Sequence, residues 1–255
     1  MWNAARFADI DPEEFFDFQA TRPHVSLVDG LTRQIDWPDN AFLHARVPGL
    51  DRDVVLMLGV EPNLRWGTFT DIVAGLARDL GVDLVLTLGA LLADVPHTRT
   101  APVTGSASDQ ELIDRLGLQA SRYEGPTGIV GVLHDACRRA GLPSVSLWAA
   151  VPHYVSLAPS PVAALALCRR IGELLKVDVD VTELEEAAER YREQVSEAVA
   201  SDAETASYVE DLERRADEIA PADLPSGDAL AAELTRFLRE REANGEDGPD
   251  VARGQ

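Results

Sequence analysis

The chain is poor in cysteine, in long apolar runs and in positive charge, and each shortage excludes a class of protein. Its two cysteines, Cys137 and Cys168, lie in apolar, helix-like stretches, so we expect buried free thiols and no disulfide. No uninterrupted apolar run reaches the roughly 18 residues of a membrane-spanning helix. Residues 1–20 are acidic, whereas a signal peptide begins with basic residues and continues with apolar ones. We therefore predict a cytoplasmic protein that does not bind membranes.

The formal net charge of −21 opposes binding to nucleic acid, because Lys and Arg supply most of the affinity for phosphate. The acidic excess is uneven along the chain. Residues 178–255 hold 23 acidic and 8 basic residues, a net charge of −15, whereas residues 1–177 hold 21 and 15, a net charge of −6. The sequence thus predicts a body of nearly ordinary charge followed by a strongly acidic extension.

Motifs for common catalytic and cofactor sites are absent as well. The chain contains no Walker pattern, no GxGxxG fingerprint, no GxSxG elbow, and no HExxH or other metal-ligand spacing among its 5 histidines. A chain of 255 residues buries enough surface to fold without a disulfide or a metal. We predict no catalytic residue, no metal and no cofactor, which favours a non-enzymatic protein and leaves catalysis open.

The body alternates strand-like and helix-like runs. Dense apolar and β-branched runs predict strands, and apolar residues at helical spacing, opened by proline or closed by glycine, predict helices. This alternation favours an α/β fold with a mainly parallel sheet and helices on both faces. From Gly89 to Ser108 the composition predicts a loop. The expected strands are 24–29, 53–60, 83–88 and 144–151, and the expected helices are 69–80, 109–116, 129–140 and 162–175.

The acidic extension is predicted to form a helical arm over residues 178–243. Apolar residues recur every three or four positions from 181 to 219, with Asp202 and Thr205 as weak positions in the stripe. The spacing predicts one long helix that bends near Ser201.

A further helix is expected after Pro225, and residues 244–255 are polar and predicted to be a disordered tail. The apolar stripe of the arm suits two uses equally. It can pack on the chain's own body, or it can bind a partner or a second copy.

The candidate site lies in the loops that leave the predicted strands. In a parallel sheet the carboxyl ends of the strands meet at one edge, where ligands commonly bind. Loops held by rigid strands also position acid and base groups well. The polar candidates are Glu61, Asp94, His97, Arg99, His153 and Tyr154.

Each candidate also has a purely structural interpretation. The loop around His97 can hydrogen-bond its own backbone, with Arg99 paired to Asp94, and His153 can be a packed structural histidine. For the loop around His97 we favour this interpretation over catalysis and weigh it evenly against ligand binding, whereas for His153 we favour the structural role over contact with a ligand. Gly128 belongs to the run GPTGIVG, where N–H groups at a helix start can hold an anion, although close helix–sheet packing is the favoured use of these glycines.

Three runs of the body together resemble a known family. They are LVLTLGALLADVPHTRTAPVTG, SRYEGPTGIVGVLHDACRRAGLPSVSLWAAVPHY and PSPVAALAL. Over roughly residues 6–177 the chain is similar to the proteasome assembly chaperone family of the second-chaperone type, in its bacterial branch, which is widespread in actinobacteria. The resemblance implies a phosphorylase/hydrolase-like α/β fold with a C-terminal helical arm. It also implies ATP-independent assembly activity, proteasome subunits as partners, and a homo-oligomer, for which we favour a trimer.

The chain departs from the family pattern at both ends. Family members begin with a strand–helix unit containing a phrase like FEGWNDAG, and the resemblance implies that this first unit is missing from the core, residues 1–177. Relatives that dock on proteasomes end in a hydrophobic–Tyr–X tail, whereas this chain ends Ala252-Arg253-Gly254-Gln255. We therefore do not expect their docking mode here.

The sequence thus supports two functions of different kinds. The leading one is an ATP-independent, assembly-chaperone-like or protein-interaction protein linked to proteasome assembly. The alternative is a small-ligand-binding protein, or a hydrolase- or phosphorylase-like enzyme, with its site at the strand ends. A closed pocket with a perturbed carboxylate or imidazole would favour the alternative, and candidates that scatter or pair with one another would favour the first.

Overall fold

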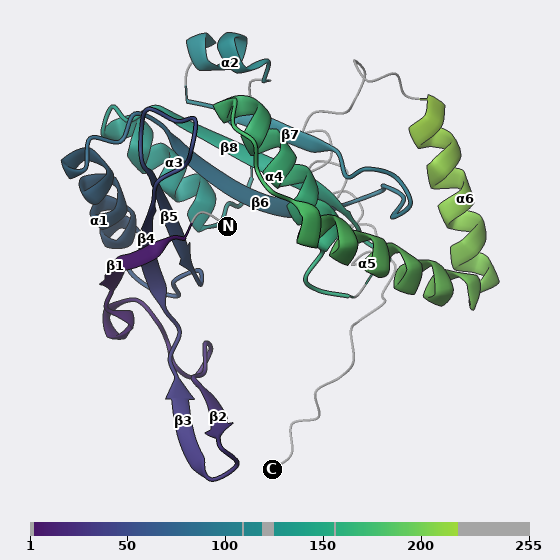
Figure 1. Cartoon of the computed structure of the whole chain (residues 1–255), viewed down its shortest axis with the longest axis horizontal. Coiled ribbons are helices and arrows are strands. Elements are labelled where there is room, and N and C mark those ends of the chain that lie inside the picture. Colours follow the sequence, from purple (N-terminus) through teal and green to yellow (C-terminus); the bar gives the residue numbers. More distant parts are fainter. Residues whose placement is uncertain (1–2, 109, 119–124, 156, 219–255) are drawn as a thin grey trace. The chain divides into compact units, whose positions relative to one another are not determined.

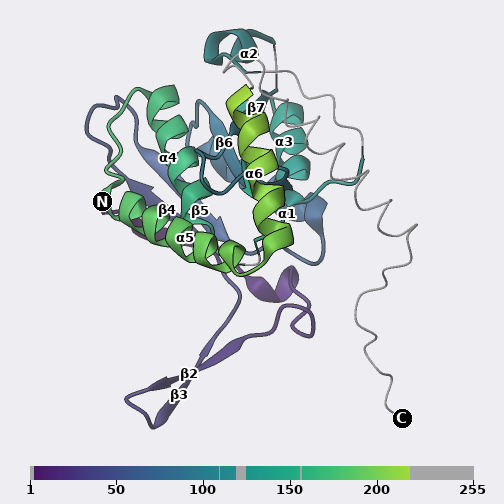
Figure 2. The same ribbon diagram turned by 90° about the vertical axis from the view of Figure 1, so that its right-hand side faces the viewer.

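A computed structural model describes residues 3–108, 110–118, 125–155 and 157–218, and Figures 1 and 2 show its elements from two sides. The chain combines strands and helices, and they alternate from β5 through α1 to β6 and from α3 through β8 to α4, so the predicted α/β class is confirmed. The strands are β1 (Ala5–Ile10), β2 (His24–Val28), β3 (Thr32–Asp36), β4 (Asn40–Ala45), β5 (Val54–Gly59), β6 (Val85–Ala93), β7 (Val103–Ala107) and β8 (Ser144–Pro152). The helices are α1 (Trp66–Asp79), α2 (Gln110–Leu116), α3 (Ile129–Arg139), α4 (Pro161–Leu175), α5 (Thr182–Ala200) and α6 (Ala203–Glu218), with a short 3₁₀ helix at Pro12–Glu14.

The described strands form three sheets, and two of these are antiparallel. One has the order β1-β4-β5, and another is the hairpin of β2 and β3. The third has the order β6-β8-β7. At the start of both β6 and β8, Val85 N–H donates to Pro143 O (2.9 Å). At the end of both strands, His153 N–H donates to Ala93 O (3.3 Å). β6 and β8 are therefore parallel.

The predicted mainly parallel sheet is wrong, and β5 explains the error. Its apolar run VVLMLG has the composition of a strand buried on both faces of a parallel sheet. β5 instead pairs antiparallel with β4. The connection between them, residues 46–53, is shorter than the dozen or so residues that a parallel crossover needs. One side of β5 also faces water, since Leu58 keeps 60% of its surface exposed.

The loop predicted from Gly89 to Ser108 is also wrong. β6 continues through Gly89 to Ala93, and β7 lies within the same segment. Glycine commonly ends a strand, but a Cβ atom at Gly89 would lie 2.5 Å from ring atoms of Trp148. The glycine is required because the Trp148 side chain approaches the backbone of β6, and not because the chain turns there.

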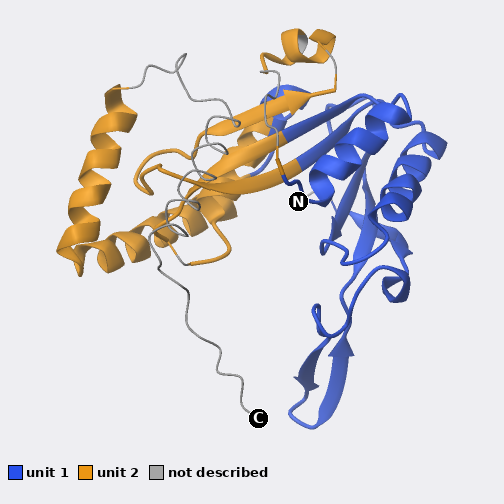
Figure 3. Ribbon diagram, turned by 180° about the vertical axis from the view of Figure 1, so that it is seen from behind, with its two compact units in different colours: residues 1–87, 126–146, 171–180 blue, residues 88–125, 147–170, 181–255 orange. Residues whose placement is uncertain are grey.

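The chain divides into two compact units, which Figure 3 shows in different colours. Unit 1 comprises residues 1–87, 126–146 and 171–180, and unit 2 comprises residues 88–125, 147–170 and 181–255. The division falls inside β6, β8 and α4. Each unit has a buried apolar cluster of its own.

In unit 1 the sheet β1-β4-β5 packs against α1, and the start of α3 joins the same core. The rings of Phe15 and Phe69 meet edge to face with their centroids 5.4 Å apart. The N–H groups of Asn63 and Leu64 both donate to Phe15 O, at 2.9 and 3.0 Å, so the core also holds the loop after β5. The buried side chains of this cluster are Ile10, Phe15, Phe16, Phe42, Phe69 and Val73, with Ile129 and Leu133 packed against them.

β2 and β3 form a hairpin that extends from unit 1 (Figures 1 and 3). Asp29 and Gly30 at its turn have positive φ angles of 52° and 73°, and Leu31 N–H donates to Val28 O at 3.2 Å. Asp-Gly is favoured where both central turn residues need positive φ. The strand predicted at 24–29 is thus confirmed, whereas its partner β3 was not predicted because its sequence, TRQID, is mostly polar.

In unit 2 the helical arm packs on α4. The apolar stripe of α5 faces the first turns of α4, and Ala188 is fully buried between them. The arm therefore uses its stripe for packing on its own unit, which is one of the two uses expected from the sequence. The buried residues of this cluster are Ala101, Val162, Leu165, Ala166, Ala188, Tyr191 and Val195.

The single long helix predicted for the arm is wrong, although the position of its bend is right. α5 ends at Ala200 and α6 begins at Ala203. Asp202 between them accepts hydrogen bonds from Glu204 N–H (3.1 Å) and from the hydroxyl of Thr205 (2.6 Å). Asp202 interrupts the apolar stripe because its side chain caps the N-terminus of α6. The helix predicted after Pro225 and the predicted tail lie outside the described residues.

Candidate functional site

The seven candidate residues fall in both units. Glu61 and Gly128 lie in unit 1. The other five lie in unit 2, after the carboxyl ends of the parallel strands β6 and β8. These five are Asp94, His97, Arg99, His153 and Tyr154. The structure brings them together, and it places residues of the helical arm directly against them.

Asp94 is bonded from two sides. Tyr208 of α6 donates its hydroxyl to Asp94 Oδ1 (3.1 Å), and His153 Nδ1 lies 3.0 Å from the same oxygen. Removal from water, followed by the nearby charge of Asp94, raises the pKa of Tyr208, so its hydroxyl stays protonated and donates. The rings of His153 and Tyr208 meet edge to face, 5.6 Å apart. Asp94 therefore links the loop after β6 to α6.

His97 is 4% exposed, and both of its ring nitrogens have partners. Its backbone N–H donates to the Tyr154 hydroxyl oxygen (2.9 Å), and its Nδ1 lies 2.8 Å from the same oxygen. Because that oxygen already accepts the backbone N–H, its own proton is directed to Nδ1. His97 Nε2 then carries the ring proton and donates it to Ser196 Oγ of α5, at 3.0 Å.

Burial keeps both members of this pair neutral. Removal from water lowers the pKa of His97 and raises the pKa of Tyr154 to about 12. Neither group is free to exchange a proton with a substrate, since each of their polar atoms is bonded within unit 2. The pair fastens α5 to the loop after β6.

Arg99 binds the last turns of α6. Its Nε and Nη2 donate to the two carboxylate oxygens of Asp217, at 2.9 and 2.8 Å, and its Nη1 lies 3.4 Å from Glu213. Thr98 donates its hydroxyl to Glu213 as well. The structural interpretation that paired Arg99 with Asp94 is therefore wrong about the partner, because the carboxylates come from the arm.

The five side chains and their partners on the arm form one structural group, which we call the arm-docking cluster. None of the five points to an unfilled site, because each bonds a residue of α5 or α6 or a neighbour that does so. The sequence showed the apolar stripe but not the polar partners beside it, although three of them directly adjoin buried stripe residues. The arm-docking cluster comprises Asp94, His97, Thr98, Arg99, His153, Tyr154, Ser196, Tyr208, Glu213 and Asp217.

Glu61 and Gly128 meet at the start of α3 in unit 1. Glu61 Oε1 accepts the backbone N–H of Ile129 at 2.6 Å. A Cβ atom on Gly128 would lie 2.9 Å from the same oxygen, so the glycine leaves room for this carboxylate. A helix N-terminus favours a negative charge, and here the chain's own Glu61 provides it. This N–H group is thus engaged by Glu61 rather than left open to an external anion.

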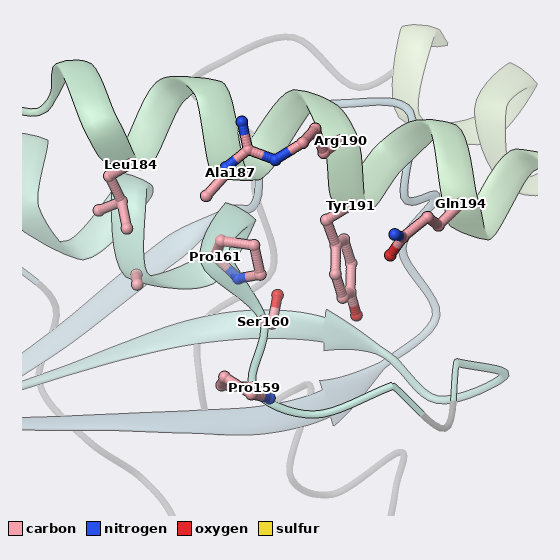
Figure 4. Close-up of a pocket in the computed structure, with 9 residues that line it drawn as sticks. Pro159, Ser160, Pro161, Leu184, Ala187, Arg190, Tyr191 and Gln194 are labelled. Carbon is pink, nitrogen blue, oxygen red and sulfur yellow. The ribbon is translucent and has the colours of Figure 1, made fainter.

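One hollow lies outside all of these residues, between the start of α4 and α5 in unit 2 (Figure 4). Its volume is about 390 Å³, and most of its lining is apolar. The Tyr191 hydroxyl on its wall donates to Leu157 O at 3.1 Å. No acid–base pair converges on this hollow. Its lining residues are Pro159, Ser160, Pro161, Ala164, Leu184, Ala187, Arg190, Tyr191 and Gln194.

We expect the folded chain to lose stability as the pH falls below the ordinary histidine value of about 6.5. Burial lowers the pKa of both His97 and His134, with nearby Glu213 and Asp135 opposing part of that effect. The unfolded chain therefore binds more protons than the folded chain in this window. The contribution is complete above the unfolded pKa and is lost as the pH falls toward the lower folded values.

Thermal unfolding midpoints measured between about pH 8 and 5 check this expectation. His97→Gln and His134→Gln should each reduce the decrease in midpoint, because each removes a histidine whose pKa is lowered in the folded chain and which must take up a proton. His24→Gln, at an exposed position of β2, is the matched control and should leave the decrease unchanged. Equal slopes in all four proteins would show that His97 and His134 do not cause the pH dependence.

Among the residues that the structure describes, no three His, Cys, Asp or Glu side chains gather as a metal site would require. Within the same ranges, no helix has the length and apolar character needed to span a membrane.

Comparison with known proteins gives the family. The family profile described as the PAC2 family matches residues 1–199, while no curated protein matches the chain. A proteasome-assembly chaperone homologue from Mycobacterium tuberculosis is 50% identical, with a TM-score of 0.73, over 82% of this chain and 88% of that one. A PAC2 family protein from Streptomyces avermitilis is 47% identical, with a TM-score of 0.75 and the same coverage of both chains, 82% and 88%.

A more distant structure extends the likeness to the archaea. The archaeal proteasome activator of Pyrococcus furiosus is 19% identical over 77% of this chain and 83% of that one, with a TM-score of 0.59, which shows a shared fold alone. Taken with the two bacterial structures and the match over residues 1–199, the resemblance noted in the sequence is confirmed. The chain belongs to the PAC2 family.

Proposed function

We propose that this protein acts without ATP and without catalysis as an assembly factor that binds proteasome subunits in the cytoplasm. The observation that supports it most is the arm-docking cluster. The groups best placed for catalysis, including His97 and Tyr154, are occupied in fastening the arm of unit 2. The mycobacterial relative described as a proteasome-assembly chaperone homologue supplies the setting.

The absence of a nucleotide motif supports ATP independence. The run GPTGIVG has no following lysine, and the N–H of Ile129 in this run is bonded to Glu61. A phosphate at this helix start would meet a carboxylate, and two negative groups repel each other. Binding and assembly should therefore proceed equally well with and without ATP.

The arm offers a binding surface that is mainly negatively charged. Residues 178–218 contain 15 acidic and 4 basic side chains, a net charge of −11. The apolar stripe of α5 is already packed on α4, so the outward side of this helix is dominated by carboxylates. Such a surface attracts a basic partner and accelerates its approach at low salt. We assign this role to proteasome α subunits, with the chain itself acting as a homo-oligomer, for which a trimer is our favoured form.

The test is binding of purified proteasome α subunits to the full chain, followed by native electrophoresis of ring formation with and without ATP. We expect binding that weakens as salt rises. Glu193→Lys, Glu197→Lys and Glu210→Lys together should weaken it at least ~10-fold, because they reverse exposed charges of the arm.

A control variant with the same change in net charge distinguishes the effect of charges on the arm from the effect of the net charge of the whole chain. Glu13→Lys, Asp71→Lys and Asp79→Lys reverse three exposed carboxylates in unit 1 and should have much less effect. Absence of α subunits among the proteins recovered with the tagged chain from native cytoplasm would reject the proposed role. Equal loss with both triple variants would reject the arm as the binding surface.

A further inference from the structure

The two faces of the β2–β3 hairpin differ in polarity. Residues directly opposite each other across two strands lie on the same face of a sheet. Val25 lies opposite Ile35, and Leu27 lies opposite Arg33. We call these four residues the apolar hairpin face. On the other face, the pairs His24 with Asp36 and Ser26 with Gln34 are polar, and Val28, opposite Thr32 next to the turn, is its one apolar residue.

Polar side chains of this second face bond one another. Ser26 Oγ donates to one carboxylate oxygen of Asp36 and Gln34 Nε2 donates to the other, both at 3.0 Å. A strand pair with one apolar and one polar face is the pattern of a sheet that packs one side and leaves the other in water. The Asp29–Gly30 turn fixes the register, and a shift by one residue would exchange the two faces.

The apolar hairpin face is nevertheless uncovered by the described part of the chain. Val25, Leu27 and Ile35 expose 59%, 63% and 54% of their surface, and Leu31 at the tip exposes 90%. A two-stranded hairpin without packing is marginally stable in water at best. The side chains that elsewhere would form a core are here presented to the outside.

The base of the hairpin is anchored, so its position within unit 1 is defined. Trp37 packs edge to face on Phe18 with the ring centroids 4.9 Å apart. Phe18 in turn packs against the main core of unit 1. A hairpin that is fixed at its base and apolar on one face has the form of a docking element.

We propose that a second copy of this chain covers the apolar hairpin face. Within residues 22–37 the charges of Arg22 and Arg33 balance those of Asp29 and Asp36, whereas the whole chain has a formal net charge of −21. Two such acidic chains repel each other across most of their surfaces, and a contact is least opposed where local charge cancels. A strongly basic partner would be attracted to the acidic arm instead.

The area of the face agrees with a contact between copies. The largest apolar patch of an ordinary monomer covers roughly 300–600 Å², and a row of aliphatic side chains exposed by more than half belongs in that range. Covered by an equal area of a second copy, it buries on the order of 1,000 Å², about the minimum for a specific interface. This inference deepens the homo-oligomer part of the proposed function and rests on it.

The test compares the oligomeric state of the full chain with that of two variants, by sedimentation equilibrium over a range of concentrations. Leu27→Thr with Ile35→Thr keeps residues that favour strands but makes the face polar, and it should weaken self-association at least ~100-fold. Ser26→Thr with Gln34→Thr changes the polar face of the same strands and should leave self-association within ~3-fold of the wild type. Circular dichroism confirms that each variant is folded.

A covalent readout identifies what covers the face. A photoreactive benzophenone amino acid in place of Leu31, in a mixture of isotope-labelled and unlabelled chains with α subunits present, should join labelled to unlabelled chains. A wild-type chain that is monomeric at every concentration overturns the inference, as does an oligomer that the Leu27→Thr, Ile35→Thr variant leaves intact. Cross-links to α subunits alone also overturn it. Binding of α subunits is measured separately on the same variants, so either proposal can fail while the other stands.

Discussion

Ala188→Asp should release the helical arm from α4 in unit 2. Ala188 has no exposed surface and lies among Val162, Leu165 and Ala166 of α4. A carboxylate placed there either remains charged without a partner or takes up a proton, and an unpaired buried charge costs roughly 3–5 kcal/mol. The arm escapes this cost by undocking, so the loss of stability is limited to the free energy of docking.

Ala198→Asp is the matched control, because it makes the same change at an exposed position of α5. Its expected penalties are the lower helix propensity of Asp, up to about 0.7 kcal/mol, and the placement of a negative charge near the end of a helix, about 0.3–1 kcal/mol. Hydrogen exchange of residues 182–218 distinguishes the two variants. Amides there should lose protection in Ala188→Asp, while those of α1 in unit 1 keep it. An arm that stays protected in this variant would contradict the packing of α5 on α4.

The apolar contact should outweigh the ion pairs that hold the same arm. Arg99 pairs with Asp217 and Glu213, but its side chain is 41% exposed, and exposed pairs contribute about 0–1 kcal/mol. Burial of Tyr191 and Val195 against α4 contributes about 1.5–3 kcal/mol for each side chain. The arm-docking cluster therefore sets the orientation of the arm more than its affinity.

The sequence predicted best those elements whose pattern is local. Helices α1, α3 and α4 begin and end within a few residues of the ranges expected from apolar spacing. The stripe of the arm was also predicted correctly at five positions that the structure buries, because helical spacing alone places them on one side. These residues are Ala188, Tyr191, Val195, Val209 and Leu212.

Strand pairing could not be derived in the same way. β3 and β4 have no alternation that identifies their partners, and the direction of β5 depends on β4, which precedes it by a short connection. The strands of β1-β4-β5 owe their order to contacts distant in sequence, such as that of Arg6 with Leu43. Composition alone suggested parallel strands. A strand buried on both faces of a parallel sheet and a strand of an antiparallel sheet that packs against one large core can have similar apolar runs.

The partners of the candidate site residues were even harder to predict from the sequence. Sequence reasoning located the strand-end residues Asp94 and His97 but not their partners, because Ser196 is 99 positions from His97 and Tyr208 is 114 from Asp94. Only the return of α5 and α6 onto their own unit brings these groups together. A polar loop after a buried strand therefore predicts that its side chains are engaged, without showing whether the partner is a ligand or the chain itself.

Gly89→Ala and Gly75→Ala should change stability in opposite directions. Gly75 lies inside α1 with open space around it, so alanine adds helix propensity and should stabilise by about 0.5–1 kcal/mol. At Gly89 the added Cβ would lie 2.5 Å from two ring atoms of Trp148 and force a shift in the sheet, which should cost about 1–3 kcal/mol. Chemical denaturation of the two variants measures both changes against the wild type.

A double-variant cycle then identifies the cause of the loss at Gly89. The backbone there does not have a positive φ, so alanine can adopt its conformation and only the space is lacking. Trp148→Leu should be destabilising alone, yet in its presence Gly89→Ala should cost much less, with a coupling of about 0.5–3 kcal/mol. If the cost of Gly89→Ala is the same with and without Trp148, the glycine is needed for the chain's conformation. If the cost disappears, β6 continues through Gly89 because the ring of Trp148 occupies the place of its side chain.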